Sequence, residues 1–538
     1  MKKRILSLMA AVCLLLSLLP AAMAEETPVF NAYDETVSVT IMGRDEKDSA
    51  TVYDSSKPDR ASANENAWID AYKKYLNIDV TRIIAEDNQA LNANLNTMMA
   101  SGELPDVMIV PKEMFYVLAE NGVLKDMSDV FNSYDGERWM SIKNSYADEV
   151  WQTGMYDGQL LGIPYAENFY NSTSVMWIRT DWLAKVGKEI PKTIDELEAV
   201  AQAFVDAKLG GDNTIGIGLA PLGNWNSDIS SIMAAYGVQL TTWVEKDGKY
   251  VYSNTLDENK EGLLRLQGMY KKGLIKPDFS VSDIMGEEIA NGNCGLYFAP
   301  AWNGVTSIKA SLENDPEAAW TPVRIPSLDG NPVAQTTNAA VTRFVVVNAD
   351  YEHPDVFFRM KELEAAVYYA SAPGTDLYDL YMLYLEDGTT LDYTMWNLMV
   401  FRGMQRGDLD LYKSKLVVEA MEKNSPDADV LPIAQSTYIR TKAGLSTDRS
   451  LLGLATTFTK GYPTVNEIVA QGLVRGAYNG PLTENMSLYQ TTINDELNSA
   501  MTKVIMGEDI SVFEKAVEAW YASGGQAITD DVNAYYGK

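Results

Sequence analysis

The chain has 538 residues, of which 46% are hydrophobic and 22% charged, so it can bury a large core and form more than one lobe. Acidic residues outnumber basic ones by 74 to 44, an excess of negative charge that argues against nucleic acid and anionic lipid as partners. One histidine, His353, and two cysteines, Cys13 and Cys294, remove most routes to a zinc site, a Ser/His/Asp triad or a disulfide framework.

Residues 1–24 have the order of a secretory signal peptide. Basic residues at positions 2–4 precede an uncharged run over 5–19, and small residues follow, with cleavage expected after Ala24. The alternative is a membrane anchor, but the run is shorter than the about 20 residues that a spanning helix needs. Cys13 lies inside the apolar run and not at the cleavage point, so lipidation is not expected. We therefore expect a secreted chain at the outer face of the cell membrane.

Short β-rich runs alternate with helical patterns in the first part of the mature chain. Strands are predicted over 37–42, 78–84 and 106–110, and helices over 67–76 and around 91–98. Strands that alternate with helices in this way indicate a mostly parallel sheet covered by helices.

A second unit is predicted after Gly158. Extended segments over 160–165 and 174–179 lead to a helix whose start is marked by a capping box, Thr193 with Glu196. Further helices are predicted over 263–270, 354–363 and from 511 to the glycines at 524–525, with strands over 293–298 and 342–348. The tyrosine-rich stretch 375–438 fits either an inserted helical cap or an amphipathic helix pair that packs its aromatic side chains into a core.

Several segments occur in an order and spacing that resemble one known family. They are Leu95-Asn-Thr-Met-Met-Ala-Ser-Gly-Glu-Leu-Pro-Asp106, Asn121-Gly-Val-Leu-Lys-Asp126, Tyr156-Asp-Gly-Gln-Leu-Leu-Gly-Ile-Pro-Tyr165, Trp177-Ile-Arg-Thr-Asp-Trp-Leu183, Pro191-Lys-Thr-Ile-Asp-Glu-Leu197, Met269-Tyr-Lys-Lys-Gly-Leu-Ile275, His353-Pro354 and the tail 513–536. Together they resemble the extracellular solute-binding proteins of ABC importers, in particular the large carbohydrate-binding kind of Gram-positive bacteria.

The resemblance implies an α/β, two-lobed, periplasmic-binding-protein-like fold of type II, with hinge strands and extra helical segments. Lobe 1 would comprise 25–163 plus about 301–370, and lobe 2 would comprise 164–300 plus about 371–538. Such a protein closes like a hinge around a ligand that touches both lobes. The resemblance also implies that the protein captures a carbohydrate, an oligosaccharide in preference to a monosaccharide, and delivers it to the permease subunits of an ABC transporter. A monomer without cofactor, and without nucleic acid as a partner, is expected.

Sugar binding needs flat aromatic faces beside polar side chains, and strand ends are the places to look for them. Trp302 follows the strand that ends at Phe298, which resembles the second lobe crossing, where the family commonly keeps a stacking tryptophan; it is the strongest candidate. The further candidates for ligand contacts are Glu167, Asn168 and Tyr170 at the first crossing, Trp225 and Asn226 in a loop after the strand 215–219, and Trp68 and Trp396. For each aromatic candidate, the alternative to ligand contact is that its side chain packs in the core.

A calcium loop, which relatives often carry, is not expected here. In the corresponding stretch, 206–216, Lys208 and Leu209 occupy expected ligand positions and only three side-chain oxygen donors remain, at 206, 212 and 213. No metal site is therefore predicted. Arg179 is expected to pair with a carboxylate, a structural role.

Two other functions stay open at this point. One is an exported carbohydrate-active enzyme, although no motif singles out the pair of carboxylates that glycoside hydrolysis needs. The other is a receptor for a peptide or another polar solute. The net charge does not decide between an acidic and a neutral sugar, because the cleft can carry its own arginines, for which Arg324 and Arg343 are candidates.

Overall fold

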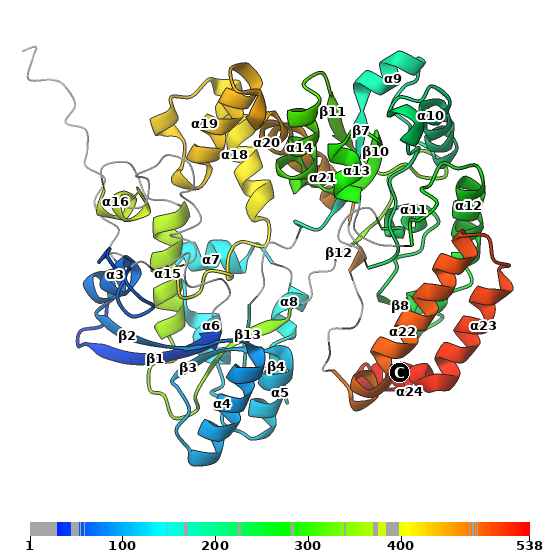
Figure 1. The fold of residues 1–538 in the computed structure, drawn as a ribbon. Coiled ribbons are helices and arrows are strands. Elements are labelled where there is room, and N and C mark those ends of the chain that lie inside the picture. The colour runs from blue at the N-terminus through cyan, green and yellow to red at the C-terminus, as the bar shows by residue number, and fades with distance from the viewer. Residues whose placement is uncertain are drawn as a thin grey trace, which may run out of the picture.

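A computed structural model describes residues 30–44, 53, 55–58, 60–146, 148–165, 170–223, 228–280, 285–337, 341–369, 375–382, 398–472, 474–475, 478, 480 and 482–537. Two separate sheets, each covered by helices, give the α/β fold two lobes (Figure 1). The first lobe is the one built on a five-stranded sheet, and the second is the one built on a three-stranded sheet.

The five-stranded sheet has the order β2-β1-β3-β13-β6. Its strands are β1 (Val37–Arg44), β2 (Ile78–Ala85), β3 (Val107–Pro111), β6 (Ile163–Pro164) and β13 (Arg343–Val347). β1 runs parallel to β2 and β3, whereas β13 is antiparallel to β3 and β6. The predicted parallel strands of the first unit are thus confirmed, and β13 joins them between β3 and the edge strand β6.

The crossover helices of this sheet are α3 (Ala67–Leu76) and α4 (Asn88–Ser101). Each begins at a side chain that accepts hydrogen bonds from first-turn backbone N–H groups, Asn66 for α3 and Asp87 for α4. α4 ends at Gly102 with a φ of 74°, a left-handed conformation that glycine adopts without a Cβ clash. Figure 1 shows α4 and α5 (Lys112–Glu120) below the sheet and α15 (Val356–Tyr369) above it.

The three-stranded sheet has the order β10-β7-β11, and all its pairs are antiparallel. Its strands are β7 (Ser174–Arg179), β10 (Leu296–Pro300) and β11 (Trp320–Val323). Successive buried side chains of β7 enter different cores: Trp177 packs in the core that also holds the first sheet, and Ile178 packs with α10 (Ile194–Asp206). The predicted capping box of α10, Thr193 with Glu196, is confirmed.

The chain returns to the five-stranded sheet only after β11, because β11 pairs with β7 in the three-stranded sheet. After β10 it continues through a short turn and α14 (Ser307–Asn314) into β11 of the same sheet, and it rejoins the five-stranded sheet only at β13. Residues 320–323, which the sequence placed with lobe 1, therefore lie in the three-stranded sheet. The division of the whole chain between the lobes remains a prediction.

Helices dominate the second half of the chain (Figure 1). They are α16 (Asp376–Met382), α18 (Leu409–Lys423), α19 (Pro432–Ser446), α20 (Leu452–Thr456), α21 (Tyr462–Ala470), α22 (Glu484–Ile505), α23 (Ser511–Trp520) and α24 (Gln526–Tyr535). The predicted break at Gly524 is present as a kink, where φ is 127°, and α24 follows it. α22 packs against α12 (Asn259–Lys271) of the second lobe.

The remaining elements are short. They are the helices α6 (Ser128–Ser133), α7 (Glu137–Lys143), α8 (Asp148–Gln152), α9 (Thr180–Val186), α11 (Ser230–Ala235) and α13 (Met285–Ala290), and the strands β4 (Met155–Tyr156), β5 (Gln159–Leu160), β8 (Trp243–Lys246), β9 (Lys249–Tyr252), β12 (Thr336–Thr337) and β14 (Val474–Arg475). Among the described residues, no helix has the length and apolar character needed to cross a membrane.

Cys294 lies just before β10 and is fully buried as a free thiol. Its sulfur donates to the carbonyl of Leu296 at 3.1 Å. Burial raises the pKa of the Cys294 thiol to about 12, so the side chain stays a neutral thiol at physiological pH.

Candidate functional site

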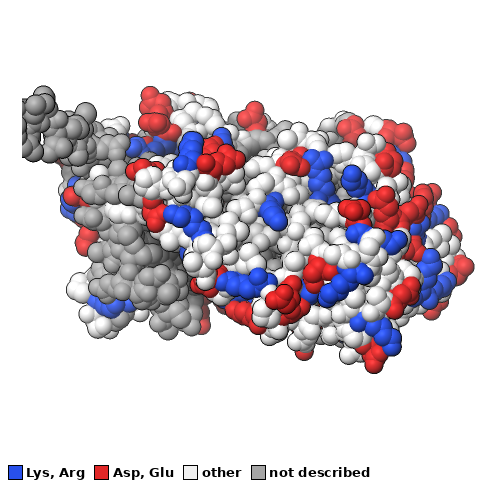
Figure 2. All heavy atoms as spheres, turned by 90° about the horizontal axis from the view of Figure 1, so that it is seen from above, with Lys and Arg blue, Asp and Glu red and all other residues white. Residues whose placement is uncertain are grey.

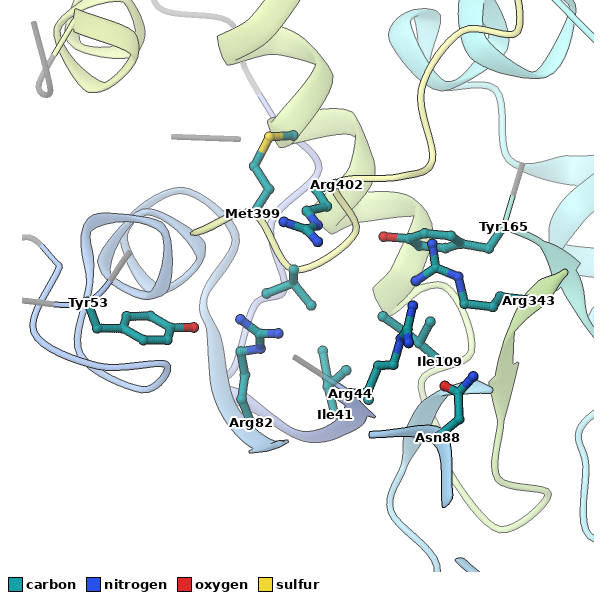
Figure 3. A pocket seen from close by; sticks show the side chains of 12 residues that line it. Ile41, Arg44, Tyr53, Arg82, Asn88, Ile109, Tyr165, Arg343, Met399 and Arg402 are labelled. Atoms are coloured by element: carbon teal, nitrogen blue, oxygen red, sulfur yellow. The ribbon is translucent and has the colours of Figure 1, made fainter. Parts of the chain in front are cut away.

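A pocket opens at one edge of the five-stranded sheet (Figure 3). Its lining residues in the described part of the chain are Ile41, Gly43, Arg44, Tyr53, Arg82, Asn88, Ile109, Tyr165, Arg343, Met399, Val400 and Arg402. Arg44 ends β1, and Arg343 begins the antiparallel strand β13 opposite Pro111, the last residue of β3. The pocket therefore lies at the carboxyl ends of parallel strands, the edge at which α/β sheets bind their ligands.

Four arginines from four different segments meet at this pocket. Arg44 and Arg82 come from β1 and β2, Arg343 from β13, and Arg402 from the segment before α18. Figure 3 shows their guanidinium groups around one common space. None of the described lining residues is Asp or Glu. The described lining residues thus bring four positively charged side chains together in a chain whose formal net charge is −30.

The arginines are close enough to act on one another. Burial, followed by the positive charges of Arg44 and Arg402, lowers the pKa of Arg343 to about 10. Like charges that share a partly dry site disfavour the charged form of each group.

Tyr165 supports one side of the arginine cluster. It follows β6, is 4% exposed, and has the guanidinium of Arg343 over its ring at 4.6 Å from the centroid, a cation–π contact. Its hydroxyl accepts a hydrogen bond of 2.7 Å from the backbone N–H of Gly403. Tyr165 therefore holds both Arg343 and the segment that carries Arg402.

A buried ion pair on α15 fixes that segment. Lys361 and Glu364 are both fully buried and lie 2.8 Å apart. Glu364 accepts from the backbone N–H of Phe401 at 3.1 Å, and Lys361 donates to the Phe401 carbonyl at 2.9 Å. The hydroxyl of Tyr72 also donates to Glu364 at 2.6 Å. Because both backbone groups of Phe401 are held, its neighbours Val400 and Arg402 are set beside the pocket.

The other polar and aromatic groups of the pocket suit a hydroxylated ligand. Tyr53 offers an aromatic ring, and the Asn88 amide can both donate and accept. Arg82 is anchored through its backbone, whose N–H donates to the Asn64 amide oxygen at 2.6 Å and whose carbonyl accepts from the same amide at 3.1 Å. This anchoring leaves the guanidinium of Arg82 directed at the pocket (Figure 3).

Most of the site residues predicted from the sequence fall outside the residues that the structure describes. These are Glu167, Asn168, Trp225, Asn226 and Trp396. Their contact with a ligand stays a prediction.

The three described candidates do not line the pocket. Trp68 is 1% exposed and stacks on Tyr72 at 5.9 Å, so its ring belongs to the core of the first lobe. Tyr170 is half-buried and packs on the same core. Trp302 is half-buried in the turn Ala301–Val305, directly after β10 of the second lobe. Contact of Trp302 with a ligand stays a prediction.

Of the two arginines named from the sequence, only Arg343 lines the pocket; Arg324 pairs with Glu467 at 2.7 Å. Sequence reasoning missed Arg44, Arg82 and Arg402. The signal for Arg44 was present, because it lies two residues after the end of the predicted strand 37–42. The structural role expected for Arg179 is confirmed by its ion pairs with Asp181 and Asp315, at 2.6 and 2.8 Å.

The two carboxylates of the stretch 206–216 contact side chains four positions away in the sequence. Asp206 accepts from Gln202 at 2.9 Å, and Asp212 pairs with Lys208 at 2.7 Å. Within the described residues, no three His, Cys, Asp or Glu side chains gather in a way that would hold a metal ion. That the stretch binds no calcium stays a prediction.

Comparison with known proteins places the chain in a family. The sequence profile described as "Bacterial extracellular solute-binding protein" matches residues 55–373, more than half of the chain. The chain belongs to the bacterial extracellular solute-binding proteins. This solute-binding protein is 23% identical over 504 residues to Lipoprotein LipO of Bacillus subtilis (strain 168), a match that covers 88% of this chain and 89% of LipO.

Two further curated relatives match shorter parts of the chain. The fructooligosaccharide ABC transporter substrate-binding protein FusA of Streptococcus pneumoniae serotype 4 (strain ATCC BAA-334 / TIGR4) is 26% identical over 269 residues, which are 46% of this chain and 49% of FusA. The polygalacturonan/rhamnogalacturonan-binding protein YtcQ of B. subtilis (strain 168) is 26% identical over 211 residues, 38% of this chain and 40% of YtcQ.

Solved structures confirm the fold as that of a type II periplasmic binding protein. A human milk oligosaccharide (HMO) binding ABC-transporter associated solute-binding protein from Bifidobacterium longum infantis ATCC 15697 has a TM-score of 0.57 at 14% identity, covering 94% of this chain and 99% of its own. The alginate-binding protein AlgQ2 has a TM-score of 0.53 at 15% identity, with the same coverages.

Proposed function

We propose that this solute-binding protein captures an oligosaccharide between its lobes and delivers it to the permease of an ABC importer. FusA and YtcQ, two relatives by sequence, are named for binding saccharide chains, and so is the solute-binding protein of B. longum infantis that shares the fold. The observation that carries the proposal is the pocket at the carboxyl edge of the β1–β2–β3 strands, beside Tyr165, where the chain leaves the first sheet.

The protein binds its ligand without turning it over. A ligand that contacts both lobes favours the closed form over the open one, and this difference is what a permease can recognise. On the second lobe we assign the stacking face to Trp302, which follows the end of β10. The further predicted contacts that we keep are Glu167, Asn168, Tyr170, Trp225, Asn226 and Trp396. The lobes act as parts of a monomer.

The chain works outside the cell, after cleavage of its first 24 residues. The basic positions 2–4 and the apolar run 5–19 support export, and the position of Cys13 within that run supports release without a lipid anchor. Mass spectrometry of the protein secreted from a Gram-positive host tests this: a chain that starts at Glu25 is expected, and retention of residues 1–24 would contradict it.

The function is tested with the mature protein and a panel of neutral and acidic oligosaccharides, peptides and amino acids. We expect at least one oligosaccharide to raise the melting temperature and to change tryptophan fluorescence in a saturable way, with no product released on long incubation. Binding of peptides in place of saccharides, or hydrolysis of a bound saccharide, would overturn the proposal.

A further inference from the structure

The ligand contact assigned to Trp302 depends on how the turn that carries it is held. Resting on the proposed function, we propose that Thr457 is a positioning residue for Trp302: its hydroxyl group fixes the backbone of the turn Ala301–Val305, so that the indole is presented to a saccharide. Thr457 acts through Trp302 and does not itself contact the ligand.

The indole of Trp302 is available for contact with a ligand. Trp302 is half-buried, and among the described residues its side chain belongs to neither of the two hydrophobic cores. Its ring also has no hydrogen bond and no aromatic contact within the part of the chain that the structure describes. A large aromatic face that contributes to no core is the kind of group that binds the apolar face of a sugar ring.

The backbone on both sides of Trp302 is held by one helix from the second half of the chain. On one side, the Thr457 hydroxyl donates to the Ala301 carbonyl at 3.1 Å, across 156 positions of the sequence, and lies 3.0 Å from the Gly453 carbonyl. On the other side, Gly304 packs so closely on this helix that a Cβ at its position would overlap Thr457 and Gly453. Trp302 therefore stands between two fixed points of the backbone.

Thr457 begins an irregular turn of this helix. α20 continues through a π-helical turn, Thr457–Gly461, into α21, and the N–H of Tyr462 donates to the Thr457 carbonyl, five residues back. The carbonyl of Phe458 accepts a hydrogen bond of 2.7 Å from the hydroxyl of Ser414 on α18. Such turns are rare, and within α-helices they frequently mark functional sites. The position of Thr457 is thus fixed from within its own helix and from α18.

The same helix reaches the segment that crosses from the first sheet to the second. The hydroxyl of Tyr462, directly after the π-helical turn, lies 3.2 Å from Asn171 Oδ1 and 2.9 Å from Asp410 Oδ2. Asn171 lies between β6 of the first sheet and β7 of the second. One helix thus holds both the turn of Trp302 and this crossing. A contact that is fixed before the ligand arrives loses little freedom on binding.

Surface charge does not explain this arrangement. On the face of the molecule seen in Figure 2, which looks down on α14 and α19, acidic and basic side chains are interspersed. Thr457 is uncharged and 1% exposed. The factor by which its removal weakens binding should therefore not depend on the salt concentration.

The test compares Thr457→Val with Thr456→Val in the mature protein. Both changes replace a buried hydroxyl by a methyl group, but the Thr456 hydroxyl donates to the Leu452 carbonyl within its own helix, which makes Thr456→Val the matched control. The probes are maltotetraose, nystose and tetragalacturonate. We expect Thr457→Val to weaken the tightest-binding probe about fivefold, the contribution of one net hydrogen bond. Thr456→Val, and Thr457→Ser, which keeps the hydroxyl, should stay within about twofold of wild type.

Two readouts separate a positioning role from a purely structural one. In protein that contains fluorotryptophan, the fluorine NMR signal of Trp302, assigned by its loss in Trp302→Phe, should shift in ligand-free Thr457→Val and not in Thr456→Val. In a double-mutant cycle, Thr457→Val should weaken binding by less than about twofold when Trp302 is already alanine. If Thr457→Val does not fold, Gly461→Ala displaces the same turn, because its Cβ would lie 3.1 Å from the Cβ of Ala301.

The possible outcomes separate this inference from the function on which it rests. If Thr457→Val leaves either the Trp302 signal or the affinity unchanged, or weakens binding equally with and without the indole, the inference falls and the proposed function stands. If Trp302→Ala binds the probe as tightly as wild type does, the inference falls too, because no ligand contact is then being positioned. If wild type binds no saccharide, the proposed function falls as well.

Discussion

Tyr165 and Gly403 meet beside the arginine pocket although 238 positions separate them in the chain: the Gly403 N–H donates to the Tyr165 hydroxyl at 2.7 Å. The ring of Tyr165 also lies against the α-carbon of Gly403, so that a Cβ at this position would overlap the ring edge. The contact joins the end of β6 to the segment before α18. Because both segments line the pocket, it also links the two sides of the pocket.

Gly403→Ala is therefore expected to lower the free energy of unfolding by about 1–3 kcal/mol and to weaken ligand binding, because the added methyl group pushes Tyr165 away from Arg343. Urea denaturation and titration with the ligand measure both effects. Gly268→Ala in α12 is the matched control: apart from its chain neighbours and the backbone of its own helix, no atom lies within 4 Å of the added Cβ, so it should be neutral or stabilise by up to about 1 kcal/mol. Equal effects of the two variants would contradict the role given to the Tyr165 contact.

Glu364→Gln breaks the buried ion pair with Lys361. We expect a loss of about 3–5 kcal/mol in the free energy of unfolding, because the ammonium of Lys361 is left buried without its counter-charge. The exposed pair of Lys309 and Glu313, 3.7 Å apart, offers the control Glu313→Gln, for which a change below about 0.5 kcal/mol is expected. If chemical denaturation shows only a small change in the free energy of unfolding of Glu364→Gln, Lys361 can release its proton in the folded variant at little cost.

Asp181→Asn tests the bidentate pair with Arg179. Burial alone would raise the pKa of Asp181, but the hydrogen bonds and charge of Arg179 outweigh burial and hold it below its ordinary value of 3.8. The stabilisation by the carboxylate is therefore complete above that value and is lost as the pH falls through the lower folded-state pKa. We expect the variant to be about 2 kcal/mol less stable than wild type at neutral pH.

The stability difference between Asp181→Asn and wild type should shrink as the pH falls below about 4, as followed by denaturation at a series of pH values. Asp212→Asn, which removes the exposed pair with Lys208, serves as the control and should change stability by less than about 0.5 kcal/mol at any pH. A difference for Asp181→Asn that stays constant down to acid pH would argue against ionisation as its cause.

Arg44→Gln should stabilise the ligand-free protein. Arg44 is exposed and its charge repels Arg343, so its removal relieves repulsion and costs little packing. An increase of a few tenths to about 1 kcal/mol in the free energy of unfolding is expected at low salt, and screening should reduce it at high salt. Destabilisation of the ligand-free protein by this change would mean that Arg44 has a structural partner.

Trp302→Ala tests the stacking face assigned to the second lobe. Loss of the indole should weaken saccharide binding by about tenfold, because an aromatic face against a sugar ring contributes roughly 1 kcal/mol or more. The half-exposed Tyr535 of α24 provides the control Tyr535→Ala, with unchanged affinity. If Trp302→Ala binds the saccharide as tightly as wild type does, the Trp302 side chain serves packing and not ligand contact.

The strands of the first unit could be predicted because each has a local pattern that does not depend on the rest of the chain. β1 alternates buried and exposed side chains at its start, and the capping box of Thr193 and Glu196 lies within four residues. β11 shows the limit of such reasoning: the sequence analysis predicted no strand over residues 320–323 and placed them with lobe 1. Pairing with β7, 141 positions away at Trp320 and Arg179, places them in the three-stranded sheet.

The pocket could be predicted only in part for the same reason. Arg44 stands at the end of a recognisable strand, and Arg343 was a candidate before the structure. Arg402 follows a segment without strand or helix periodicity, and it reaches the pocket through the hydrogen bonds of Phe401 with α15. A tertiary contact of this kind leaves no trace in the local sequence. The residue type of Trp68 likewise does not say which way its ring faces, and the ring lies in the core of the first lobe.

Cys294 gives this chain a practical property. The mature protein would keep this one thiol, which is fully buried and stays protonated far above neutral pH, so thiol-directed dyes and spin labels would pass it by. Cysteines introduced in pairs, one on each lobe, could thus be labelled without replacing any native residue. Distances between such labels, read with and without a saccharide, would follow the movement of one lobe toward the other in solution.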